Sequence, residues 1–171
     1  FKMSFEKINI KDLKMNPFQA IGKDWLLISA GDQDGINTMT ASWGGVGVLW
    51  GEDVVTVYIR PQRYTKQFVD KQDCFSLSFF NGNYKKELGI LGTKSGRDGD
   101  KIREVHFHTT FLDGVPTFEE ADTVFIVEKI YEDTIKPENY LDTSLDEKWY
   151  PEKDYHTVYI AKIKSVYVKK A

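Results

Sequence analysis

Segments rich in β-branched and aromatic residues recur along this chain, and short turn signals containing glycine and aspartate separate them. Such segments favour β-strands. The pattern predicts strands at residues 25–30, 38–43, 54–60, 75–80, 123–131 and 157–168. Short helices are expected at residues 65–71, 84–91 and 101–105. Many strands with short helices between them predict a mainly β fold, a closed or nearly closed antiparallel barrel with helical additions.

The bulk properties of the chain limit its organisation. Its 171 residues contain no repeat, low-complexity tract or proline-rich linker, so a single domain over residues 1–171 is expected. A formal net charge of −3 gives no electrostatic reason to bind nucleic acid or an anionic membrane surface. We also expect no membrane span and no signal peptide, because the chain lacks the apolar run that each requires.

Cys74 is the single cysteine of the chain. It has no internal disulfide partner, so a reducing, cytoplasmic location is expected. Free cysteines are usually buried and unreactive. We therefore favour a small buried residue at this position, with a redox-active thiol as the alternative.

A polar run lies on the strand predicted at residues 38–43. Because alternate side chains of a strand share a face, one face carries Thr38, Thr40 and Ser42. The other face carries Asn37, Met39, Ala41 and Trp43. Three hydroxyls on one face are poor core material, because each needs a hydrogen-bond partner when it is buried. The run predicts the rim of a ligand site, and a solvent-facing strand edge is the alternative.

A second polar run, at residues 60–65, joins a predicted strand to a predicted helix. Arg60 shares the face of its strand with Tyr58, and a guanidinium group can bind phosphate through two parallel hydrogen bonds. Thr65 is expected to cap the helix, and a helix N-terminus beside Arg60 and Arg63 suits a phosphate dianion. The alternative is a pair of surface arginines bound to acidic neighbours.

Four sequence strings occur here in the order known from one protein family. They are Thr38–Gly44 (TMTASWG), Tyr58–Thr65 (YIRPQRYT), Leu91–Ile102 (LGTKSGRDGDKI) and Asp154–His156 (DYH). Through these strings the chain resembles, over residues 18–168, flavin reductase-like proteins of the FMN-binding split-barrel fold, in particular the flavoredoxin-type branch. The resemblance implies a Greek-key-like split β-barrel that binds FMN.

The resemblance also implies a location for each part of FMN. The isoalloxazine ring is expected along Met39–Trp43, and the phosphate near Arg60, Tyr64 and Thr65. In similar proteins the loop that carries Ser95 and Lys101 approaches the flavin. The full set of expected cofactor-binding residues is Asn37, Thr38, Met39, Thr40, Ala41, Ser42, Trp43, Arg60, Arg63, Tyr64, Thr65, Phe79, Phe80, Ser95 and Lys101. The two phenylalanines, at a strand end, are either a pocket wall or part of the core.

His156 is the one catalytic candidate. In related flavin reductases a histidine in a Gly-Asp-His pattern precedes the final strand and lies near the flavin and the nicotinamide. Here Tyr155 stands between Asp154 and His156, so a histidine at the barrel mouth or interface without a chemical role is the alternative. His106 and His108 are two residues apart, but no defined set of further ligands accompanies them. We expect surface histidines there, and no metal site.

The resemblance implies a function in electron transfer. Electrons would pass from NADH or NADPH through FMN to free flavin or to an acceptor protein, in a homodimer with the flavin near the interface. The chain has no Gly-x-Gly-x-x-Gly run of the Rossmann type, and no Ser-His-Asp order or carboxylate pair that suggests hydrolysis. One alternative is a flavoredoxin-like electron carrier without its own nicotinamide site, and another is a non-enzymatic binder of a different planar ligand.

Residues 136–155 are acidic and aromatic. We expect a long excursion between two strands, because long ordered loops in compact domains often serve a site or an interface. Candidates for interface or lid residues are Trp50, Tyr140, Trp149 and Tyr150.

Overall fold

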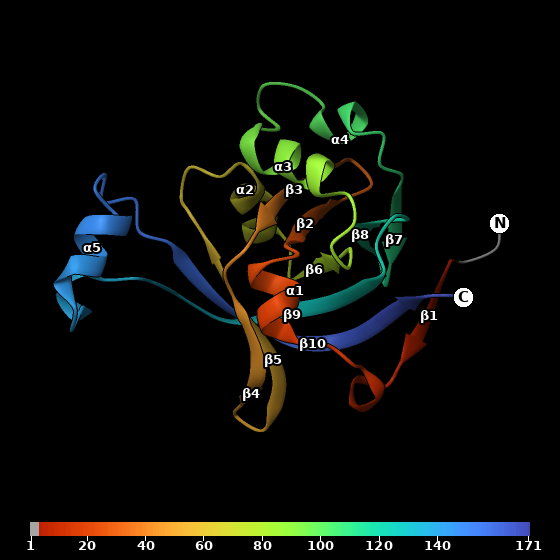
Figure 1. Cartoon of the computed structure of the whole chain (residues 1–171), viewed down its shortest axis with the longest axis horizontal. Helices are drawn as coiled ribbons and strands as arrows, with labels where there is room; N and C mark the ends of the chain where they lie inside the picture. The colour runs from red at the N-terminus through yellow and green to blue at the C-terminus, as the bar shows by residue number, and fades with distance from the viewer. Residues whose placement is uncertain (1–3) are drawn as a thin grey trace.

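The computed structural model describes residues 4–171, and its core is one antiparallel sheet of eight strands. Residues 1–3, part of the N-terminus that we expect to carry no signal peptide, lie outside the described residues. The strand order is β3-β2-β6-β9-β10-β5-β4, with β1 paired to β10 (Figure 1). The bounds are β1 Phe5–Ile8, β2 Leu26–Asp32, β3 Gly35–Ala41, β4 Gly45–Leu49, β5 Glu52–Ile59, β6 Cys74–Phe79, β9 Thr123–Thr134 and β10 Thr157–Lys169. The predicted mainly β architecture is confirmed.

Short helices and a separate hairpin complete the fold. The hairpin pairs β7 (Thr109–Leu112) with β8 (Val115–Phe118). The helices are α1 Pro17–Gly22, α2 Thr65–Lys71, α3 Lys85–Thr93, α4 Lys101–Glu104 and α5 Thr143–Trp149, with 3-10 turns at η1 Ile10–Asp12 and η2 Pro137–Asn139. None of the helices formed by residues 4–171 has the length and apolar character needed to cross a membrane.

The sequence predicts all six long strands and three of the helices, α2 with the observed bounds. It does not predict α1, α5, β1, β4, β7 or β8. Each missed strand has only four or five residues, too few for a clear alternating pattern. In β4, glycines at positions 45 and 47 further weaken the strand signal.

The sheet buries apolar side chains on both faces. Along β2, Leu26, Ile28 and Ala30 belong to the barrel core, whereas Leu27 belongs to a second core on the opposite face. Helix α3 and the β7–β8 hairpin cover this second core with Leu88, Leu91, Leu112, Val115 and Phe118. Both sides of the sheet are therefore apolar, which explains why β2 reads as a nearly continuous hydrophobic run.

Residues 135–156 form the expected excursion between β9 and β10 and contain η2 and α5. Figure 1 shows α5 projecting away from the barrel, beyond the ends of these two strands. Within residues 136–155, Tyr150 is the one buried residue. Its side chain is therefore the main anchor of the excursion on the body of the protein.

Cys74 is half-buried at the start of β6 and packs against the second core. Burial, followed by the nearby Glu128 and Asp73, raises the pKa of its thiol. A raised pKa lowers the fraction of reactive thiolate. The environment therefore favours an unreactive structural cysteine over a redox-active thiol, although the side chain is not fully buried.

Candidate cofactor site

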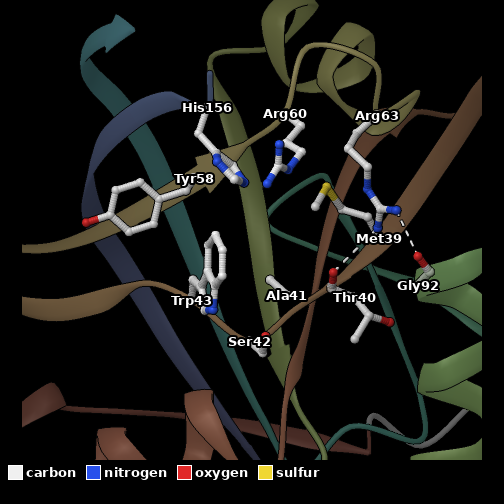
Figure 2. A pocket seen from close by; sticks show the side chains of 10 residues that line it. All are labelled: Met39, Thr40, Ala41, Ser42, Trp43, Tyr58, Arg60, Arg63, Gly92 and His156. Carbon is white, nitrogen blue, oxygen red and sulfur yellow. Dashed lines mark hydrogen bonds between the residues drawn. The ribbon is translucent and has the colours of Figure 1, made fainter. Parts of the chain in front are cut away.

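The end of β3 and the residues that follow it form one wall of an open cavity of about 260 Å³, here called the β3 cavity. Strand β5 and the start of β10 bring further side chains to it, and α3 closes one side. Its lining consists of Met39, Thr40, Ala41, Ser42, Trp43, Tyr58, Arg60, Arg63, Gly92 and His156 (Figure 2). Tyr58 and Gly92 are absent from the predicted set. Tyr58 was recognisable from the sequence, because it lies two residues before Arg60 and shares its strand face.

A second cavity, of about 160 Å³, is here called the Lys101 cavity. It shares Met39 and Arg63 with the β3 cavity, so the two are neighbours. Its lining consists of Asn37, Met39, Gln62, Arg63, Tyr64, Thr65, Thr93, Lys94, Ser95 and Lys101. The fold thus brings together, around two adjoining cavities, most of the residues that the sequence predicts for the site.

Three predicted residues lie elsewhere. Phe79 is part of the barrel core and Phe80 part of the second core, so neither lines these two cavities. Thr38 is fully buried, and its hydroxyl hydrogen-bonds to Ser29 Oγ at 2.8 Å and donates to the Ile28 carbonyl at 3.1 Å. The expectation of a hydroxyl rim is wrong for Thr38, because its register partner on β2 is a serine that satisfies it inside the protein.

Thr40 is positioned by α3. Its hydroxyl donates to the Leu88 carbonyl at 2.5 Å. A Cβ at Gly92 would lie 3.0 Å from Thr40 Cβ, so glycine permits the close approach of α3 to β3. Helix and strand are thereby held in contact at the boundary between the two cavities.

Arg63 extends between the two cavities. Its Nη1 donates to the Gly92 carbonyl at 2.8 Å and its Nη2 to the Thr40 carbonyl at 3.5 Å (Figure 2). Burial lowers the pKa of its guanidinium from the usual value. Among residues 4–171, no carboxylate forms a salt bridge with it.

Lys101 is the second cation near these cavities and is more deeply buried than Arg63, only 5% exposed. Its ammonium group donates to the Leu91 carbonyl at 2.8 Å and to the Lys94 carbonyl at 3.0 Å. Burial and, after it, the charge of Arg63 lower the pKa of Lys101 to about 8. Within the described residues, 4–171, it forms no salt bridge. One buried and one half-buried cation, each bound only to carbonyl groups among residues 4–171, make this region attractive to an anion.

The rest of the Lys101 cavity is polar and closely packed. The Asn37 side chain donates to Thr65 Oγ1 at 2.9 Å. A Cβ at Gly96 would lie 2.3 Å from Asn37 Oδ1, so glycine is needed for the loop to approach β3. Thr65 is the first residue of α2 and not its N-cap, which is Tyr64 without a side-chain cap. The predicted capping role of Thr65 is wrong, because Asn37 engages its hydroxyl.

Arg60 has a different environment from Arg63. Its Nη1 forms a salt bridge with Asp154 Oδ2 at 2.7 Å, and its Nη2 donates to the Trp149 carbonyl at 2.9 Å. In Figure 2 its guanidinium lies beside His156, on the far side of the cavity from Gly92. The structure therefore separates Arg60 from Tyr64 and Thr65, with which the sequence groups it, and supports the alternative of an arginine paired with an acidic neighbour.

His156 and Tyr150 form a buried pair at the Arg60 end of the β3 cavity. The Tyr150 hydroxyl lies 2.6 Å from His156 Nδ1. Burial and, after it, the charge of Arg60 lower the pKa of His156 to about 4, with Asp154 acting in the opposite direction. Trp43 lies 5.4 Å from the imidazole and 5.1 Å from the Trp149 ring, centroid to centroid. The excursion at residues 135–156 therefore contributes side chains to the candidate site. In the sequence, the aromatic composition of this segment is the one sign of that contribution.

His106 and His108 are exposed, as predicted. His108 Nδ1 lies 3.4 Å from Glu120 Oε1. The described part of the chain contains no group of three or more histidine, cysteine or acidic side chains arranged to hold a metal ion.

No family model matches the chain, and no curated protein matches it. Solved structures are similar to it. An FMN-binding protein from Thermus thermophilus with bound p-hydroxybenzaldehyde shares 21% identity over 86% of this chain and 72% of its own, with a TM-score of 0.66. The FMN-binding domain of a flavin reductases-like enzyme from Shewanella baltica shares 14% identity over 96% of this chain and 77% of its own, with a TM-score of 0.69. Flavoredoxin from Desulfovibrio vulgaris shares 20% identity over 85% of this chain and 69% of its own, with a TM-score of 0.66.

At these identities the likeness establishes the fold. The chain has the split-barrel fold, as the sequence predicts, and the similarity extends over most of its length.

Proposed function

We propose that the chain is an FMN-binding flavoprotein of the flavin reductase-like family. The observation that carries this proposal is the pair of cations formed by the half-buried Arg63 and the buried Lys101, which has no carboxylate partner within residues 4–171 and lies beside an open cavity. An isolated buried cation is costly, and a bound anion offsets the cost of both. The similar solved structures from Thermus and Shewanella are described as FMN-binding.

The residues present fit each part of FMN. The phosphate suits the Lys101 cavity, where Arg63, Lys101 and the hydroxyls of Ser95 and Tyr64 supply donors. The isoalloxazine ring suits the β3 cavity, where Met39–Trp43 supplies apolar surface and backbone donors. This assignment moves the phosphate from Arg60 to Arg63, because Asp154 already balances the charge of Arg60.

The activity that we propose is oxidoreduction, with electrons moving from NADH or NADPH through FMN to free flavin or a protein acceptor. FMN supplies the redox chemistry when it is bound, and the protein supplies binding, orientation and electrostatics. A strong acid or base is not required for hydride transfer, which agrees with a His156 that stays uncharged at neutral pH. A flavoredoxin-like carrier without a nicotinamide site is the second candidate, favoured by the likeness to flavoredoxin.

We also propose a homodimer in a reducing, cytoplasmic setting. Among residues 4–171, strand β4 pairs with β5 alone and is an edge strand of the sheet, and its Val48 is 73% exposed. The neighbouring Trp50 is 64% exposed, so the edge is apolar as well as open. A second copy of the chain is the occupant that we propose for this edge, since unprotected edge strands otherwise aggregate. Trp43, which lies two residues before β4, would bring the β3 cavity close to such an interface.

The test of the flavoprotein proposal is a titration of FMN into the purified protein, followed by flavin fluorescence and absorbance. We expect saturable binding of about one FMN per chain, as for a single built site. No binding, with no yellow colour in the protein as purified, would overturn the proposal and favour another planar ligand. Oxidation of NADH or NADPH with FMN alone would then support the reductase, whereas bound FMN without turnover would support the carrier.

A further inference from the structure

We propose that Tyr150 is a positioning residue that fixes the tautomer of His156, so that the imidazole presents its Nε2–H to the β3 cavity as a hydrogen-bond donor. The hydrogen bond between the Tyr150 hydroxyl and His156 Nδ1, at 2.6 Å, is the observation from which the inference starts. The tautomer of His156 is a property of the protein without any ligand. Its consequence for a ligand rests on the proposed binding of FMN.

Tyr150 is held firmly enough to act in this way. Both it and His156 are only 6% exposed. The Tyr155 ring packs against the Tyr150 ring with a centroid separation of 4.8 Å, and Arg60 Cζ lies 4.9 Å from the Tyr150 centroid. Arg60 is itself bound to Asp154 and to the backbone of α5. Burial and the contacts with Tyr155 and Arg60 therefore hold the Tyr150 ring, and with it the position of the hydroxyl oxygen.

The position of the protons follows from the chemistry of the pair. A neutral imidazole has one N–H donor and one acceptor nitrogen. If the Tyr150 hydroxyl donates to Nδ1, the imidazole proton is on Nε2. A phenol O–H, with an ordinary pKa of about 10, is a stronger hydrogen-bond donor than the N–H of a neutral imidazole, and an imidazole nitrogen is a stronger acceptor than a phenol oxygen. At the 2.6 Å separation of the two atoms, donation from the hydroxyl to Nδ1 is therefore the preferred arrangement.

Burial and the positive charge of Arg60 both oppose the binding of a second proton to the His156 imidazole. Arg60 is the cation that faces His156, and Asp154, which partly offsets it, is already paired with Arg60. The remaining neighbours are the rings of Trp43, Tyr58 and Tyr150. With burial as the largest cause, the pKa of His156 falls to about 4. The imidazole is therefore neutral at pH 7, and its donor does not depend on pH near neutrality.

His156 lines the β3 cavity, and Nδ1 is engaged on the side of Tyr150. The remaining ring nitrogen, Nε2, is therefore the one available to a ligand. With FMN bound along Met39–Trp43, the fixed N–H and the nearby Arg60 would stabilise negative charge that develops on the ring during reduction. The excursion would in this way change the midpoint potential of the bound flavin through the single hydroxyl of Tyr150.

The tautomer is measured by long-range 1H–15N NMR of the imidazole rings in the protein without flavin. His156→Gln assigns the signals, and the exposed His106 and His108 serve as internal references. In the wild type we expect an unprotonated Nδ1 and a protonated Nε2, unchanged from pH 6 to 8, about two or more units above the His156 pKa. A wild-type spectrum with the proton on Nδ1 overturns the proposal, whatever the variants do.

Tyr150→Phe removes the hydroxyl and keeps the ring. We expect both tautomers to appear, and the proton affinity of His156 to rise about tenfold, the value of one hydrogen bond to the neutral form. The matched control is Tyr155→Phe, because that hydroxyl donates to Asp146 at 2.8 Å and does not contact His156. Tyr150→Phe spectra identical to those of the wild type would overturn the inference.

If FMN binds, Tyr150→Phe and His156→Gln should both lower the midpoint potential of the bound flavin, whereas Tyr155→Phe leaves it unchanged. A potential that both variants leave unchanged overturns the proposed effect on FMN. Failure of FMN to bind contradicts the proposed function and leaves the NMR result intact, so the two proposals fail separately.

Discussion

At the scale of single residues, the environment determines what a charge can do. Arg60 and Arg63 are three residues apart and look equivalent in the sequence. Arg60 pairs with Asp154 at 2.7 Å, and its charge is balanced. Arg63 is half-buried, donates to two carbonyl groups and lies near Lys101, and its charge is not balanced by the described residues 4–171. An anion therefore gains more from Arg63 than from Arg60.

Arg63→Ala is expected to weaken FMN binding far more than riboflavin binding, since only FMN carries the phosphate. The loss of a charge-assisted hydrogen bond is worth about 1.5–3 kcal/mol, or about ten- to a hundredfold in affinity. Fluorescence titrations with both ligands measure the ratio. Arg60→Ala is the control and should change both affinities to a similar extent. Equal losses for the two ligands in Arg63→Ala would remove Arg63 from the phosphate site.

At the scale of elements, α3 is positioned by how closely it can approach β3. Two glycines of this helix have contrasting surroundings. A Cβ at Gly89 would meet nothing within 4 Å, whereas one at Gly92 would lie 3.0 Å from Thr40 Cβ. The Gly92 carbonyl also accepts the hydrogen bond of Arg63. The helix is thus part of the site and not only a cover for the second core.

Gly89→Ala is expected to raise the free energy of unfolding by about 0.5–1 kcal/mol, because alanine is the better helix former and has room here. Gly92→Ala should bring no such gain and should weaken FMN, since α3 must move away from Thr40 and takes the Gly92 carbonyl with it. Urea unfolding and FMN titration of both variants provide the comparison. A Gly92→Ala protein as stable and as tight-binding as Gly89→Ala would contradict this account of the helix.

At the scale of the whole molecule, the sheet ends in an exposed apolar edge. In the part of the chain that the structure describes, strand β4 pairs with β5 alone, and Figure 1 shows the β4–β5 hairpin extending beyond the rest of the barrel. Such an edge is normally protected by charge, by a covering element or by a partner. In β4 the exposed side chains are valines, so protection by charge is absent from this strand.

Val48→Lys is expected to convert a dimer into a monomer, because it replaces an exposed apolar side chain at the edge of the proposed interface by a charged, strongly hydrated one that must lose its water on association. Light scattering coupled to size-exclusion chromatography measures the mass. Thr109→Lys introduces the same charge at an exposed position of β7 and should leave the mass of the dimer unchanged. A Val48→Lys protein that is still dimeric, or a wild type that is monomeric, would exclude β4 as the interface.

Local sequence patterns were enough to predict the strand-rich architecture and most of the residues that line the two candidate cavities. Strand patterns are local, so six long strands and α2 could be recognised without knowing their neighbours. The site strings were likewise contiguous, and twelve of the fifteen expected cofactor residues line one of two adjoining cavities.

The partner of each side chain, in contrast, depends on how segments distant in the sequence pack together. The sequence cannot show that Ser29 satisfies the Thr38 hydroxyl, that Asp154 neutralises Arg60, or that Tyr150 meets His156 across a turn of the excursion. These contacts join different strands and loops, and their energies depend on burial and on the direction of each side chain. Local pattern fixes the elements, whereas the charge and protonation of the site depend on how those elements pack.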